Sequence, residues 1–104
     1  MVKKYKVCSE VVIWPGEQGV WHFAYVDKKQ SAQIREEYSG PRRGFGAVRV
    51  RAKIGKTTWE TSIFPDRRSG CYIVPLKAAI RRAEGIVQGD TITTSLSIKI
   101  DKPF

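Results

Sequence analysis

From Val48 to Ile100 the chain alternates apolar and polar residues almost without interruption. Period-2 alternation is typical of β-strands that bury one side and expose the other to water. Two segments break the pattern, a helix that we expect to begin at Pro75 and a turn at Gly89-Asp90. The pattern therefore predicts a mainly β protein built from amphipathic strands.

The clearest local prediction is a hairpin with a two-residue turn at positions 55–56. In this register Ala52 faces the indole of Trp59 on the buried side. On the other side Arg51 faces Glu60, an opposite-charge pair directly across the ladder. A slip of one residue would turn every apolar side chain outward, so we expect this register to be strongly specified.

The first 26 residues predict two more strands. The first places its apolar residues between Tyr5 and Ile13 on one side, and we expect it to end at positions 14–16 because Pro15 cannot donate to a ladder. The second runs from Val20 to Val26, with its aromatic residues on one side and His22 and Ala24 on the other. The aromatic residues expected in the core are Trp21, Phe23, Trp59 and Phe64.

A short helix is predicted after the second strand. Asp27 is a typical N-cap, and Gln30, three residues later, completes a capping-box pattern. Ile34 and Tyr38 then form a narrow apolar stripe. A stop signal at positions 40–41, glycine followed by proline, ends the helix.

The second predicted helix follows Pro75, whose missing N–H costs nothing in a first helical turn. Gly85 ends it, since glycine tolerates the left-handed conformation of a C-cap. The apolar residues recur at helical spacing and predict one buried face. They are Leu76, Ala79, Ile80 and Ala83.

Sequence motifs over most of the chain carry a family resemblance. They are Trp21-His22-Phe23 and the segments 43–50, 54–59, 61–66, 69–70, 72–77, 81–85 and 89–92. Together they resemble a prokaryotic domain-of-unknown-function family, number nineteen-oh-five; Asp27 departs from its pattern, where we expect proline. The resemblance implies a small closed β-barrel of about six to seven mostly antiparallel strands with two short helices. It brings no catalytic or cofactor-binding residue.

Length and composition agree with one globular domain over residues 1–104. Apolar residues make up 41% and charged residues 28%, as in ordinary soluble proteins. No apolar run is long enough to cross a bilayer or to act as a signal sequence, so we expect a cytoplasmic protein without membrane contact. Cys8 and Cys71 lie in strand-like segments and are expected to be reduced, although the spacing leaves a disulfide open.

The net charge of +9, from 19 basic and 10 acidic residues, points to an anionic partner such as nucleic acid or a phosphate-bearing ligand. On the predicted hairpin Arg49, Arg51 and Lys53 form a ladder with a repeat of about 7 Å. Such a ladder can follow a phosphate backbone without reading sequence. A solvated strand side, partly neutralised by Glu60, explains the same residues, and both interpretations stay open.

Other basic residues extend the anion-binding hypothesis. Two lie in the glycine-rich loop before the hairpin and two on the second helix, where a helix N-terminus favours anions. The complete set of candidates is Arg42, Arg43, Arg49, Arg51, Lys53, Lys77 and Arg81. Segment 43–50 also partly fits an RNA-recognition-motif signature, but the side that should carry stacking aromatics carries the cationic ladder, so we reject that assignment.

No residues form a recognisable catalytic or metal-binding pattern, and we expect no cofactor. The first hypothesis is therefore a non-enzymatic binding module for an anionic partner. The alternative is a small-molecule-binding barrel or minimal enzyme with a pocket near Trp21, His22, Trp59 and Lys77. A third is a protein-interaction domain that self-associates through a strand edge.

Overall fold

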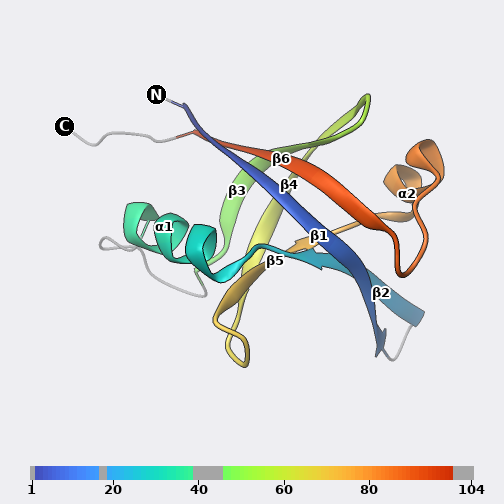
Figure 1. Ribbon diagram of the computed structural model, residues 1–104, viewed down its shortest axis with the longest axis horizontal. Helices are drawn as coiled ribbons and strands as arrows, with labels where there is room; N and C mark the ends of the chain where they lie inside the picture. The colour runs from blue at the N-terminus through green and yellow to red at the C-terminus, as the bar shows by residue number, and fades with distance from the viewer. Residues whose placement is uncertain (1, 17–18, 39–45, 100–104) are drawn as a thin grey trace.

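Six antiparallel strands close into a barrel in the computed structural model, which describes residues 2–16, 19–38 and 46–99 (Figure 1). The order around the barrel is β1-β2-β5-β4-β3-β6. The strands are β1 (Val2–Gly16), β2 (Gly19–Tyr25), β3 (Val48–Ile54), β4 (Thr57–Asp66), β5 (Cys71–Pro75) and β6 (Thr91–Lys99). With helices α1 (Lys28–Tyr38) and α2 (Ala78–Glu84), this confirms the expected mainly β barrel with two short helices.

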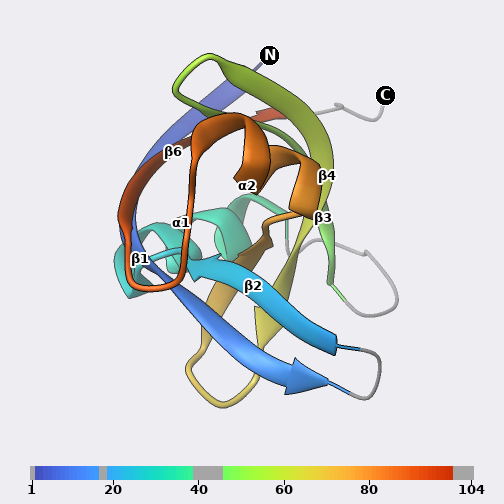
Figure 2. The same cartoon turned by 90° about the vertical axis from the view of Figure 1, so that its right-hand side faces the viewer.

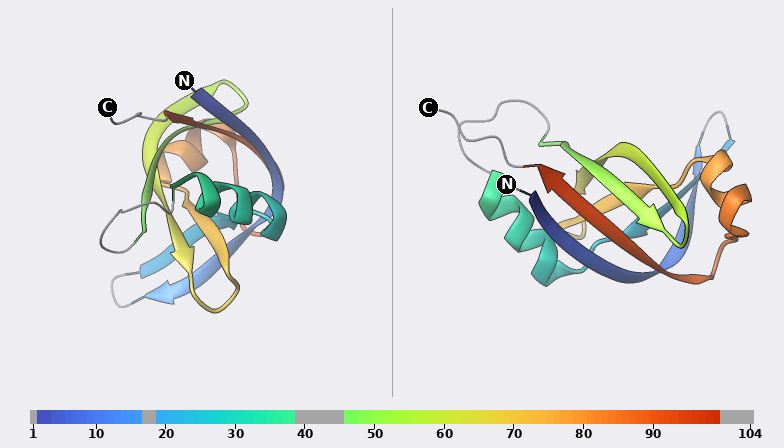
Figure 3. Two further views of the ribbon diagram at one scale, coloured as in Figure 1. Left: turned by 90° about the vertical axis from the view of Figure 1, so that its left-hand side faces the viewer. Right: turned by 90° about the horizontal axis from the view of Figure 1, so that it is seen from above.

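The helices cover the two ends of the barrel. Figure 2 looks onto the end covered by α2, and the left view of Figure 3 looks onto the end where α1 lies. Ile34 of α1 is fully buried in the larger core cluster, and Ile80 of α2 is also buried. Trp59 packs against both this cluster and a second one around Leu76. The core is therefore continuous between the two capped ends.

The β3–β4 hairpin has the predicted register. Ala52 pairs with Trp59 and Arg51 pairs with Glu60. Along β3 every second residue is buried, beginning with Val48, and the intervening residues are exposed. The turn glycine, Gly55, has a φ of 58°, which a residue with a side chain rarely adopts.

Helix α1 begins as predicted, at an Asp27 cap. The backbone N–H of Gln30 donates to Asp27 Oδ1 at 2.8 Å, and its side-chain amide donates to Oδ2 at 2.6 Å. Burial raises the pKa of the Asp27 carboxyl, but these hydrogen bonds outweigh it and the pKa lies below its ordinary value. The predicted stop at positions 40–41 lies outside the described residues.

β1 ends at Gly16, as predicted, with Pro15 still inside its ladder, whereas Pro75 lies at the end of a strand and not at the start of a helix. Pro15 continues β1 and pairs with Val20, in a stretch where β1 pairs with β2 and its β6 ladder has already ended at Glu10. The missing N–H therefore costs no ladder bond on the β6 side. Pro75 ends β5, paired with Phe23, and α2 begins only at Ala78. Proline at a strand edge or end is compatible with both ladders.

Two predictions about burial were wrong. Trp21 is 64% exposed, because the outward side of β2 carries the aromatics and the inward side carries His22 and Ala24. On α2 only part of the expected apolar face is covered, since Ala79 and Ala83 are exposed. With just seven residues, α2 rests on the barrel through one edge that contains Ile80.

Both cysteines are free thiols. Cys71 is buried, as expected of a structural thiol, whereas Cys8 lies exposed on the outward side of β1. In the described part of the chain, neither helix is long and apolar enough to span a membrane.

Candidate anion-binding surface

The outward side of β3 carries the three predicted cations. Arg49, Arg51 and Lys53 are all exposed. Arg51 lies 3.4 Å from the Glu60 carboxylate, and both side chains are 63% exposed. Arg49 donates to the Ser62 hydroxyl at 3.4 Å. An ion pair this exposed contributes less than about 1 kcal/mol, so the pairing holds Arg51 only loosely.

Closure of the barrel brings two lysines of β1 onto the same surface. β6 lies between β3 and β1, so Ser97 pairs with Arg51 on one side and with Lys4 on the other. One step along, Ser95 pairs in the same way with Lys53 and Lys6. Each row thus places a serine between two cations. We call this surface the basic strip, and its residues are Lys4, Lys6, Arg51, Lys53, Ser95 and Ser97.

The strip has dimensions suited to an extended anion. Neighbouring strands lie about 4.8 Å apart, which separates the Cα atoms of the flanking cations by about 10 Å, and the two rows repeat at about 7 Å. All four cations are exposed, whereas the serines between them are half-buried. The result is a shallow line of hydroxyl groups with N–H donors on both flanks, the donor types that proteins use to hold phosphate oxygens.

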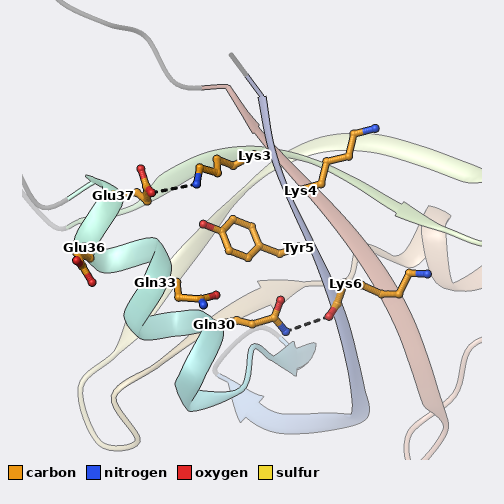
Figure 4. A pocket seen from close by; sticks show the side chains of 8 residues that line it. All are labelled: Lys3, Lys4, Tyr5, Lys6, Gln30, Gln33, Glu36 and Glu37. Atoms are coloured by element: carbon orange, nitrogen blue, oxygen red, sulfur yellow. Dashed lines mark hydrogen bonds and ion pairs between the residues drawn. The ribbon is translucent and has the colours of Figure 1, made fainter.

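Sequence reasoning missed two of the four cations of this strip, Lys4 and Lys6. The alternation does place Lys4 and Lys6 on the side of β1 away from Tyr5, and Figure 4 shows both pointing away from α1 while Tyr5 points toward it. However, the pairing of β1 with β6 joins residues about 90 positions apart. No local sequence pattern predicts such a pairing, so the sequence alone could not connect these lysines with the cations of β3.

The other predicted cations lie elsewhere or outside the described residues. Arg42 and Arg43 fall in the undescribed segment. Lys77 is exposed at the N-cap of α2. Arg81 donates from Nε to the Leu76 carbonyl at 3.1 Å, and its Nη1 lies 3.5 Å from His22 Nε2. This side chain ties α2 to the barrel, and neither residue joins the basic strip.

Of the four residues expected around a ligand pocket, Trp21 lies on the opposite side of the barrel wall from His22 and Trp59. Trp21 points outward from β2 and is largely exposed, whereas Trp59 points inward and packs against both core clusters. His22 lies on the inward side of β2 beside Arg81. The alternation of a strand accounts for the position of Trp21, because neighbouring residues such as Trp21 and His22 project to opposite sides.

A hollow of about 380 Å³ lies between β1 and α1, and none of those four residues lines it (Figure 4). Its rim includes the ion pair of Lys3 with Glu37, at 3.3 Å, and the Gln30 amide, which donates to the Lys6 carbonyl at 2.9 Å. Tyr5 lies between them (Figure 4). Burial, and then the nearby Glu37 carboxylate, raise the pKa of its phenol above 10.0. At neutral pH the phenol therefore stays protonated and offers an O–H donor.

Within the barrel, several polar atoms lack a hydrogen-bond partner among the described residues. They are Ser9 Oγ, His22 Nδ1, Trp59 Nε1 and Thr94 Oγ1. Buried groups of this kind need a partner such as water. No carboxylate or thiol belongs to this set. Among the described residues, His, Cys, Asp and Glu side chains nowhere gather in threes as a metal site would require.

Fold and surface together define a small six-stranded barrel, closed at both ends by helices and basic along one outward face. Residues 8–96 match a family described as "Domain of unknown function (DUF1905)". The match covers most of the chain, so this protein belongs to that family. No curated protein matches this chain.

Proposed function

We propose that this protein is a non-enzymatic binding module that holds the phosphate backbone of a nucleic acid on the basic strip. The observation that carries the proposal is the pair of cross-strand rows, Arg51–Ser97–Lys4 and Lys53–Ser95–Lys6. Sheet pairing aligns four cations on one face, with hydroxyl donors between them. Strand positions are fixed by the barrel, so the Cα positions of these cations are set before any ligand arrives.

Net charge adds long-range attraction to this local arrangement. A charge of +9 concentrates polyanions near the surface, and the strip then supplies the direct contacts. Contacts to phosphate position a nucleic acid without reading its sequence, so we expect little base preference from the strip alone. Glu60 is the acidic residue that competes for Arg51.

Fluorescence anisotropy with a labelled duplex and a labelled single strand of equal length tests the proposal. Binding should weaken steeply between about 50 and 200 mM salt. If the four cations each neutralise one phosphate, the slope of log K against log salt is about −3.6 for the duplex and about −2.8 for the single strand. Absence of salt-dependent binding at low ionic strength would refute the proposal.

A matched pair of variants separates the strip from net charge. Replacing Arg51 and Lys53 by alanine should reduce the duplex slope by about 1.8, because two phosphate contacts are lost. Replacing Arg82 of α2 and Lys77 at its N-cap, which are also exposed, changes the net charge by the same amount. That control should retain nearly the full slope. Equal weakening by both pairs would mean that charge alone governs binding.

The alternative of a small-molecule pocket receives less support. The 380 Å³ hollow is lined by residues of β1 and α1, none of which belongs to the set Trp21, His22, Trp59 and Lys77. Self-association through a strand edge stays a prediction, as does a cytoplasmic location. Barrel closure leaves few strand edges unpaired.

A further inference from the structure

The outward side of β1 leads from the basic strip to a pair of exposed tryptophans. Even-numbered residues of β1 face outward, and the series that begins with Lys4 and Lys6 ends at Trp14. Trp14 pairs directly with Trp21 across the β1–β2 ladder. Their exposed fractions are 41% and 64%, in a chain with three tryptophans. Exposed aromatic groups that neighbour each other usually mark a binding surface.

The two indoles rest on a structured base. Trp14 packs edge-on against the buried ring of Phe23, with centroids 4.6 Å apart and an interplanar angle of 77°. Phe23 in turn packs against Tyr25 at 5.5 Å. Nε1 and Cδ1 of Trp21 lie 2.6 and 2.8 Å from the place where a Cβ on Gly16 would stand. The bare backbone of Gly16 therefore makes room for the Trp21 ring.

From this arrangement we infer that the protein prefers single-stranded nucleic acid and stacks unpaired bases on Trp14 and Trp21. The inference rests on the proposed function, since the basic strip would hold the backbone of the same strand. Every base offers a flat face to an indole, whereas paired bases in a duplex are already stacked on each other. A small barrel that combines cations with stacking aromatics has the two components of single-strand binding surfaces.

Charge and composition favour this occupant over an apolar protein surface. On the outward side of the ladder the large exposed residues are indoles rather than aliphatic chains, and Trp14 shares the outward side of β1 with Lys4 and Lys6. Lys6 and Trp14 are eight residues apart on β1, a path of at most about 27 Å. Glu10 interrupts that path with a negative charge, so Glu10→Gln should tighten single-strand binding.

The test compares a labelled oligothymidine of about 16 nucleotides, the upper end of site sizes for a small barrel, with a duplex of equal length. The variant Trp14→Ala/Trp21→Ala should lose about tenfold or more in single-strand affinity, because each stacked base contributes at least several-fold. Its duplex affinity and salt slope should not change. Val20→Ala is the matched control, since Val20 is 52% exposed on the same hairpin but faces the opposite side.

Intrinsic fluorescence provides a second readout. Oligothymidine should quench the tryptophan emission of the natural protein and leave that of the double variant unchanged, because its remaining indole, Trp59, lies in the core. Gly16→Ala keeps both indoles but displaces Trp21, and it should reduce the single-strand preference in part. Thermal unfolding monitored by circular dichroism verifies that each variant is folded.

The outcomes distinguish this inference from the proposed function. Unchanged single-strand affinity in the double variant, with salt-dependent binding intact, would overturn the base-stacking inference alone. If the natural protein shows no salt-dependent binding to either oligonucleotide, the proposed function is overturned. A concentration-dependent dimer in gel filtration that Trp21→Ala dissociates, with oligonucleotide binding unchanged, would assign this surface to self-association and also overturn the inference.

Discussion

In the β3–β4 pair the inward positions hold mostly aliphatic side chains and the outward positions hold mostly polar and charged ones, whereas in the β1–β2 pair the bulkiest side chains point outward. Ala24 fills the inward side of β2, and Phe23 and Trp21 lie outside. Both pairs follow the same alternation, yet the surface of one is polar and that of the other aromatic. The alternation therefore fixes which residues share a side, while the barrel interior decides which side is buried.

This difference has a consequence for stability. Outward cations on β3 can be replaced with little effect on folding, because they contact mainly solvent. On β2 the outward Phe23 is only 3% exposed, since Trp14 and Tyr25 pack against its ring. The aromatic surface thus forms a small second packing layer outside the barrel.

Phe23→Ala should give the largest stability change. Removal of a buried phenylalanine ring lowers the free energy of unfolding by about 3 kcal/mol or more, whereas Arg49→Ala, outward on β3, should change it by less than about 0.5 kcal/mol. Urea denaturation followed by circular dichroism measures both. Similar small losses in the two variants would show that the aromatic side of β2 contributes no packing.

The helix that joins the two strand pairs offers the next largest effect. Asp27→Ala removes the carboxylate that accepts two hydrogen bonds from Gln30, and it should lower the free energy of unfolding by about 1 kcal/mol. Asp27→Ser, which retains a capping oxygen, is the control and should recover most of the loss. Oligonucleotide binding should not change, because α1 carries no residue of the basic strip.

The features that could be predicted from sequence depend on neighbours in the chain. The register of the β3–β4 hairpin, with Arg51 opposite Glu60, follows from its short turn and its alternation. The cap at Asp27 follows from a pattern three residues long. In both cases the partners are close in sequence, so a local pattern contains the necessary information.

The features that could not be predicted depend on closure of the barrel. Lys4 and Lys6 join the β3 cations through β6, a contact between the two ends of the chain. The sequence also could not show that the aromatic side of β2 faces outward, because both sides of this strand carry apolar residues. The alternation groups residues by side, but it does not indicate which side is buried. Half of the cations of the basic strip and the exposed tryptophan pair were therefore found only in the structure.

The stability of the protein depends on pH through Asp66, which contacts Tyr25 at the edge of the aromatic β1–β2 side. Asp66 accepts hydrogen bonds from the Ser69 hydroxyl at 2.9 Å and from the Tyr25 phenol at 3.3 Å. The bond from Ser69 lowers the pKa of Asp66 below 3.8, against the opposing effect of burial. Because the folded pKa lies below the unfolded one, this stabilisation is complete above pH 3.8 and is lost as the pH falls through the folded pKa.

Asp66→Asn should therefore be less stable than the natural protein at neutral pH, with a difference that shrinks as the pH falls below 3.8.

Tyr25 behaves in the opposite sense, since burial and then Asp66 raise the pKa of its phenol above 10.0. Its contribution is present below pH 10.0 and is lost as the pH rises through the folded pKa, and Tyr25→Phe should remove that alkaline loss. Unfolding curves across the pH range measure both effects. A constant Asp66→Asn difference from neutral pH to pH 2 would contradict the assignment.

Glu60→Gln should have the smallest effect on stability and the most informative effect on binding. The side chains of Arg51 and Glu60 are each 63% exposed, and Arg51 Nη2 lies 3.4 Å from Glu60 Oε2. Loss of this exposed ion pair should change the free energy of unfolding by less than about 1 kcal/mol. Arg51 then has no carboxylate partner across the ladder, and duplex affinity at low salt should rise about twofold to fivefold, the size of a weak charge interaction. Glu36→Gln on α1 makes the same charge change away from the strip and serves as the control in the anisotropy assay. An equal rise in both variants would attribute the gain to net charge, and no rise in either would mean that Arg51 does not contact phosphate.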